Sequence, residues 1–270
     1  MFKNRVLIAL AGVLCVCLLT GICLTGCSNP ENAVSPVTES EVSDVEWIDP
    51  STVPDAPDRE LIDPSEKVLL SDEWTLLSSR IAPPSLECYA AFTVPRNDPQ
   101  EPDLYLYVIQ GKIVSEADLT SPILDNPKQN EVLKEKYGGS GLQNETWYTV
   151  DLEQVWYGDI PESQRQIDLW IGGGKDSLIT KPDVGEEVVL FLYVQNGEYT
   201  ALDLEHGIFT VNDDGTLYSF SNLERFCKYD GQPVQVLIDD LYQAIEEAQK
   251  FDDFNQAISA SREKYRNSSD

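Results

Sequence analysis

Residues 104–114, LYLYVIQGKIV, decide the fold of this chain. Apart from Gln110, Gly111 and Lys112, every residue of the stretch is apolar or aromatic, and most of them favour extended backbone. A continuous apolar run of this kind is typical of a strand that is buried on both faces. The stretch therefore predicts a strand in the core of a β-rich domain.

More strands are expected after this first one. Residues 146–157, TWYTVDLEQVWY, alternate between apolar and polar side chains, which is typical of a half-buried strand. Residues 188–194 form another continuous apolar run, and residues 212–215, NDDG, have the composition of a hairpin turn. The other expected strands are 86–94, 167–171, 199–202, 208–211 and 217–220.

Helices are expected on either side of these strands. Residues 69–79 and 125–137 predict two short helices, and Pro233 suits the first turn of a longer one over 233–266. Six or seven strands with flanking helices predict a mainly β, α+β domain built as a small antiparallel barrel or sandwich. The apolar residues of the long helix recur at three- or four-residue steps and form one stripe. This stripe consists of Val234, Leu237, Leu241, Ile245, Ala248 and Phe251.

The start of the chain has the layout of a secretory signal peptide. Residues 1–26 place Lys3 and Arg5 before an apolar run and contain no acidic residue. The run ends in Leu24-Thr25-Gly26-Cys27, which resembles the lipobox of bacterial lipoproteins. The resemblance implies cleavage before Cys27, acyl chains such as palmitate on that residue, and anchoring on the extracytoplasmic face of a bacterial cell membrane. The alternative is an uncleaved helix, since about 20 apolar residues span a bilayer.

Residues 27–66 have the composition of a tether. They contain eleven acidic residues, one basic residue and six prolines. Such a segment buries too little apolar surface to offset its ordering entropy, and its like charges repel one another. We therefore expect a disordered acidic stalk between the membrane and a domain spanning 67–232. The alternative is a docking site for a basic partner, centred on Trp47 and Ile48.

The composition of the chain excludes some functions. There are 47 acidic and 19 basic residues, a net charge of −28, so the phosphates of DNA or RNA would be repelled. The chain has a single histidine, His206, and no G-x-S-x-G motif that would supply a serine nucleophile for it. Residues 172–175, GGGK, lack the spacing of a phosphate-binding loop, and residues 212–215 lack that of an EF-hand. We therefore expect no catalytic residue, no metal, no cofactor and a protein that is not an enzyme.

Two cysteines remain after the leader and the lipobox. Cys88 and Cys227 would form a disulfide in an extracytoplasmic protein. The bridge would close a loop of roughly 140 residues and contribute about 4–5 kcal/mol in the chain-entropy account of disulfides. The alternative is a pair of buried thiols that behave as small apolar groups.

Glycine-containing motifs lie in or beside the expected strands over residues 104–220. They comprise Gly111 in the first strand, Tyr157-Gly158 after the second, Val184-Gly185 before the apolar strand, and Gly207 before residues 208–211. This order resembles the netrin-like, or TIMP-like, domain of tissue inhibitors of metalloproteinases and of exported bacterial proteins of unknown function. The resemblance implies an OB-like barrel, here closed by the C-terminal helix. It does not imply protease inhibition, because Cys27 is expected to carry lipid and the dense disulfides of that family are missing.

Four aromatic residues are candidates for a binding surface. Trp147, Trp156, Tyr157 and Trp170 lie on or beside the polar faces of expected strands, where a row of exposed rings would bind a peptide or a sugar. The alternative is that they fill the barrel or pack beneath the C-terminal helix. We expect a lipid-anchored envelope protein whose domain binds a partner, a protein rather than a glycan. The alternatives are an extracytoplasmic enzyme with an unrecognised site and an accessory subunit of a membrane complex.

Overall fold

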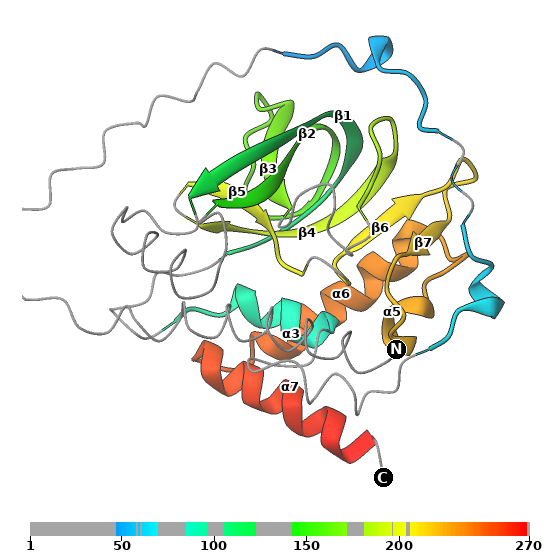
Figure 1. Ribbon diagram of the computed structural model, residues 1–270. Helices are drawn as coiled ribbons and strands as arrows, with labels where there is room; N and C mark the ends of the chain where they lie inside the picture. The colour runs from blue at the N-terminus through cyan, green and yellow to red at the C-terminus, as the bar shows by residue number, and fades with distance from the viewer. Residues whose placement is uncertain are drawn as a thin grey trace, which may run out of the picture. The chain divides into compact units, whose positions relative to one another are not determined.

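The computed structural model describes most of the chain beyond residue 46 (Figure 1). The signal peptide with Cys27, the helix expected at 125–137, nearly all of the one expected at 69–79, and the turn at 172–175 lie outside the described residues. The described ranges are 47–57, 59, 61–69, 85–96, 105–122, 142–171, 181–195, 197–203 and 206–268.

Of the seven strands in the described ranges, five close into a barrel. The strand order is β1-β2-β3-β5-β4-β6-β7, and β1 also pairs with β4, so the first five strands in this order form a ring. All pairings are antiparallel except that of β3 with β5. A five-stranded Greek-key barrel of this kind is an OB-like fold, which confirms the expected fold class. The strands are β1 Leu106–Pro122, β2 Leu142–Tyr157, β3 Gln166–Ile171, β4 Glu187–Gln195, β5 Glu198–Ala201, β6 Ile208–Val211 and β7 Leu217–Ser219.

Strand β1 bends sharply because it must pair with strands on both of its edges. Gly111 lies opposite Leu152 of β2 and opposite Val188 of β4. A Cβ atom at Gly111 would collide with the backbone carbonyl oxygen of Asp151, so only glycine lets the two backbones approach this closely. Three irregularities in the register between β1 and β2 add to the bend.

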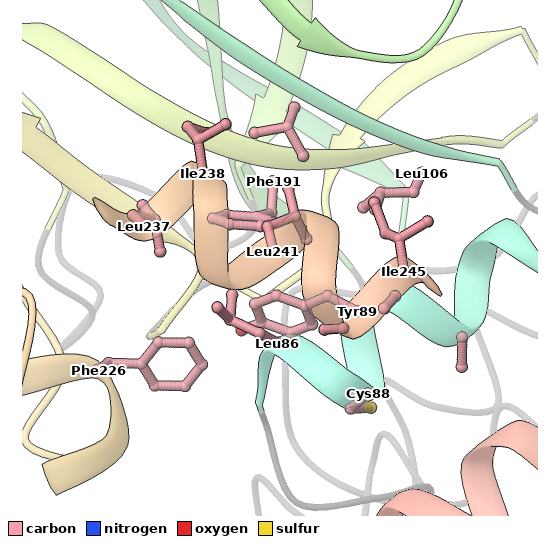
Figure 2. Close-up of a cluster of buried hydrophobic side chains, with 14 of the residues drawn as sticks. Leu86, Cys88, Tyr89, Leu106, Phe191, Phe226, Leu237, Ile238, Leu241 and Ile245 are labelled. Carbon is pink, nitrogen blue, oxygen red and sulfur yellow. The ribbon is translucent and has the colours of Figure 1, made fainter. Parts of the chain in front are cut away.

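Two hydrophobic cores stabilise the domain. One fills the barrel, and includes Tyr148, Leu169 and Leu190. The other lies between the outer surface of the barrel and the helices, where Phe191 of β4 meets Leu241 (Figure 2). The helices around this second core are α3 Leu86–Ala90, α5 Glu224–Cys227, α6 Val234–Ala248 and α7 Phe254–Ser268.

Residues 86–93 are helical, so the strand expected at 86–94 is wrong. They form α3 and the 3-10 turn η3 Ala91–Thr93, with the Ser85 hydroxyl accepting a hydrogen bond from the Cys88 N–H at 3.0 Å. A short apolar run does not distinguish a buried strand from a buried helix. Here the run is buried because it lies within the second core.

The long C-terminal helix expected over 233–266 is divided into two. The predicted apolar stripe of α6 is buried from Val234 to Ala248, but the helix ends there. Asp253 then accepts a hydrogen bond from the Asn255 N–H at 2.9 Å and begins α7, while the Phe254 N–H donates to the Pro95 carbonyl. An aspartate at a helix N-terminus favours such a new start.

The described part of the expected stalk is ordered. Residues 47–57, 59 and 61–69, which we call the strap, run along the barrel rather than forming a disordered spacer. Arg59 pairs with Asp183 and Glu186 and lies 5.0 Å from the ring centroid of Phe220. A few basic and apolar side chains thus attach a segment whose overall composition is typical of disorder.

The end of the strap is held by a buried ion pair. The side chains of Lys67 and Asp230 are each only 2% exposed, and Lys67 Nζ lies 2.7 Å from Asp230 Oδ2. Lys67 also donates to the Ser219 carbonyl and lies 4.0 Å from the ring centroid of Tyr218. Asp230 Oδ1 accepts the Ser219 N–H at 2.6 Å, so both charges are compensated by hydrogen bonds inside the protein.

Replacement of Lys67 by Met should destabilise the domain by about 3–5 kcal/mol, because Asp230 would remain buried without its cation. Urea unfolding at neutral pH measures the loss. The matched control is Lys250→Met, whose partner Glu247 forms an exposed pair; that change should cost less than about 1 kcal/mol. Equal costs for the two variants would show that the buried pair does not hold the strap.

Candidate functional site

Two tryptophans lie next to each other on the outside of the barrel. Trp147 of β2 is directly opposite Trp170 of β3. Their neighbours along each strand point into the barrel, so the alternation of side chains turns both indoles outward. Directly opposite side chains on paired strands have Cβ atoms about 4.5–5.5 Å apart, so the two rings form one apolar surface. The inward neighbours are Tyr148, Leu169 and Ile171.

A row of polar side chains borders the two indoles. The Ser115 hydroxyl donates to Thr149 Oγ1 at 2.9 Å, and the Thr149 hydroxyl donates to Asp168 Oδ1 at 2.7 Å. These side chains lie on the same outer face as Trp147 and Trp170, across β1, β2 and β3. We call these five residues the tryptophan face.

The two indole N–H groups differ in their surroundings. Trp147 Nε1 lies 3.4 Å from Glu145 Oε2. Trp170 Nε1 is buried and has no hydrogen-bond partner among the residues that the structure describes. A buried donor without an acceptor costs free energy, so packing rather than a hydrogen bond holds the Trp170 ring in place.

Trp156 and Tyr157 do not join this face. Trp156 is the extra residue of an irregularity in β2, and its indole N–H donates to Gln110 Oε1 at 3.2 Å. Tyr157 lies edge-on to Tyr242 of α6, with ring centroids 6.5 Å apart, and the Tyr242 hydroxyl donates to the Trp156 carbonyl. The structure therefore brings together two of the four expected aromatic residues and packs the other two against the helical core.

His206 is part of a buried hydrogen-bond network. Its Nδ1 lies 2.7 Å from the Ser221 hydroxyl, and its ring stacks on Phe226 at a centroid distance of 5.9 Å. Ser221 is 1% exposed, and its hydroxyl also accepts the Leu223 N–H. A substrate could not reach this hydroxyl, so the Ser–His contact lacks the accessibility of a nucleophile.

The two cysteines of the domain are free thiols in the structure. The disulfide expected between Cys88 and Cys227 is not formed: Cys88 is buried, as the alternative of two buried thiols expects, whereas Cys227 is only half-buried. Burial within the second core raises the pKa of Cys88 to about 12, so this thiol stays protonated at neutral pH. The Cys227 thiol donates to the Ser221 carbonyl at 3.0 Å, which gives it a partner of its own.

A pair of carboxyl groups lies in a groove between the strap and the barrel. The groove has a volume of about 1400 Å³ and includes Glu153 and Glu187. Burial and the neighbouring charge and hydrogen bond of Glu187 raise the pKa of Glu153. Gln110 Nε2 donates to Glu187 Oε1 at 2.5 Å and holds that carboxylate in place. With 47 acidic residues in the chain, no sequence pattern singles out these two.

The turn at residues 212–215 and the side chains that could bind a metal are also described by the structure. Residues 212–215 form the turn between β6 and β7, and Asp214 accepts the N–H and hydroxyl of Thr216. Within the described ranges, no group of three or more His, Cys, Asp or Glu side chains is placed to hold a metal ion.

Comparison of the chain with protein-family models, with curated proteins and with solved structures finds no match. None of the helices in the described part of the chain is long and apolar enough to cross a membrane. The candidate site therefore rests on the geometry of the barrel itself.

Replacement of Glu187 by Gln should stabilise the domain at pH 7 and have little effect at pH 4. Folding raises the pKa of Glu153 above its ordinary value of 4.5, so the fold favours the protonated form of this residue. The stability that results is fully present below pH 4.5 and is lost as the pH rises through the folded-state pKa. The variant removes the repelling charge, so the difference from the wild type should grow with pH. Urea unfolding between pH 4 and 8 measures it, with the exposed Glu246→Gln as control. A difference independent of pH would contradict the coupling.

Proposed function

We propose that this protein is a lipoprotein of the bacterial cell envelope, anchored through Cys27, whose OB-like domain binds another envelope molecule without catalysing a reaction. The observation that carries the proposal is the outward-facing pair of Trp147 and Trp170. OB folds use the surface of their second and third strands to bind ligands. The tryptophan face occupies that surface.

The chemistry of the face suits a binding role. Two adjacent indoles offer a large, rigid apolar area, and tryptophan is among the residues that contribute most to binding free energy. Ser115, Thr149 and Asp168 hydrogen-bond to one another, so their side chains are held in place before a partner arrives.

The charge around the face favours a protein partner. Asp168 lies within it and Glu145 borders it, in a chain of net charge −28. Phosphate groups would be repelled here, whereas basic and apolar side chains of a protein would be attracted. An envelope glycan is the second choice, because sugars also pack against indole rings and hydrogen-bond to carboxylates.

The lipid anchor would keep the domain near its partner. The lipobox Leu24-Thr25-Gly26-Cys27 supports attachment of two or more acyl chains, which anchor a protein stably where a single chain does not. In this proposal the residues between Cys27 and the strap would connect the anchor to the barrel.

The double change Trp147→Ala and Trp170→Ala should abolish partner binding. Cells carrying the tagged full-length protein are treated with a crosslinker, and the attached molecules are quantified. Loss of two central tryptophans should lower the yield of the specific partner at least tenfold, since each such residue contributes about 2 kcal/mol or more. Tyr242→Ala, an exposed ring on α6, is the control and should leave capture unchanged. Equal capture by the double variant would remove the tryptophan face from the binding site.

Replacement of Cys27 by Ser should prevent lipid attachment. The variant should run as an unprocessed precursor and lose incorporation of labelled palmitate, because the acylated thiol is missing. Metabolic labelling and detergent phase partitioning measure both effects. Cys23→Ser, a change within the leader, is the control and should be processed normally. Unchanged labelling of the Cys27 variant would refute the lipid anchor.

A further inference from the structure

Next to the tryptophan face, at the start of β3, a side chain already holds a piece of main chain. Gln166 begins β3, and the residue is 9% exposed. Its Oε1 accepts the N–H of Ile48 at 3.0 Å, and its Nε2 donates to the carbonyl oxygen of Ile48. A single side-chain amide thus pairs with both main-chain groups of one strap residue, as a neighbouring strand would.

Asp151 sets the orientation of this amide. Gln166 Nε2 also donates to Asp151 Oδ1 at 3.0 Å. Because a carboxylate only accepts hydrogen bonds, the NH₂ group must face Asp151, and Oε1 is then left to accept the N–H of Ile48. Asp151 is therefore a positioning residue for a cradle that recognises main chain whatever the side chain.

The cradle is continuous with the tryptophan face. Gln166, Asp168 and Trp170 alternate along β3 and point to the same side. At about 3.3 Å per residue, Trp170 lies about 13 Å from Gln166, the length of four residues of extended chain. An extended segment seated on Gln166 would therefore reach the carboxylate of Asp168 and then the two indoles.

We propose that the tryptophan face binds an extended polypeptide whose main chain pairs with Gln166, and that Trp47 and Ile48 occupy this position as an intramolecular ligand. The partner displaces them and places a basic side chain near Asp168 and an apolar one on the indoles. This inference rests on the proposed function, because it uses the same face and names its partner. The strap is the occupant that shows what the cradle accepts.

The contact of the strap with the cradle is suited to displacement. Trp47 remains 51% exposed, and Arg165 lies 5.8 Å from its ring centroid. The firm attachments of the strap are further along, at Arg59 and at the buried pair of Lys67. Residues 47 and 48 can therefore leave the cradle while the remainder of the strap stays attached.

The test uses the full-length protein in detergent and a fluorescent synthetic peptide of residues 45–53, VEWIDPSTV, which carries the strap sequence in trans. The wild type should bind it weakly, because its own strap competes. Ile48→Pro in the protein removes the competing N–H and should tighten binding at least tenfold. The same peptide N-methylated at its isoleucine should not bind the Ile48→Pro variant more tightly than the wild type, since its isoleucine nitrogen cannot donate to Gln166.

Gln166→Ala in the Ile48→Pro background should also abolish binding, with thermal unfolding as the check on folding. The N-methylated peptide keeps the test decisive where that variant is unstable, because it leaves the barrel unchanged. Three results would each overturn the inference. The peptide could bind the wild type and the Ile48→Pro variant equally well, or the methylated peptide could bind the variant as tightly as the unmethylated one. The third is that the peptide binds neither protein. If the peptide fails while Trp147→Ala with Trp170→Ala still loses a cell-surface partner, only the inference falls and the proposed function stands.

Discussion

The double pairing of β1 is the constraint on which the rest of the structure depends. Its first half hydrogen-bonds to β2 on one edge and to β4 on the other, and this closes the ring. Closure requires a strand that bends, which Gly111 permits because no Cβ atom separates it from the backbone at Asp151. Once the ring is closed, alternation along β2 and β3 sends one set of side chains inward and turns Trp147 and Trp170 outward.

The strap depends on this barrel, and it is attached by a few polar contacts rather than by a core of its own. A charged group inside a protein costs several kcal/mol unless it is paired and hydrogen-bonded. Lys67 and Asp230 meet both conditions through Ser219, whose N–H and carbonyl complete the network between the strap, β7 and the turn before α6. The acidic composition of the strap keeps its other residues in contact with water.

The sequence predicts the barrel well because its signals are local. Continuous and alternating apolar runs mark β1, β2 and β4, and the stripe from Val234 to Ala248 marks α6. The predictions from sequence fail where contacts between distant parts of the chain decide the structure. Residues 86–90 are apolar enough for either a strand or a helix, and burial beneath α6 together with the Ser85 cap favours the helix. The pairing of Trp147 with Trp170 depends on register, and that of Gln166 with Ile48 joins residues 118 positions apart. No local pattern predicts either contact.

In the proposed binding role, affinity and selectivity would have different origins on this surface. The indoles of Trp147 and Trp170 supply apolar area that any extended peptide or sugar could use. The carboxylates, including Asp168, act over a longer range and favour basic partners while repelling acidic ones. The strap is itself acidic, so its hold on Gln166 is opposed by the charge of the face beside it. In the proposed displacement, an intramolecular ligand of unfavourable charge would be weak enough to yield to a basic competitor, so the acidity of the strap would favour its exchange for a partner.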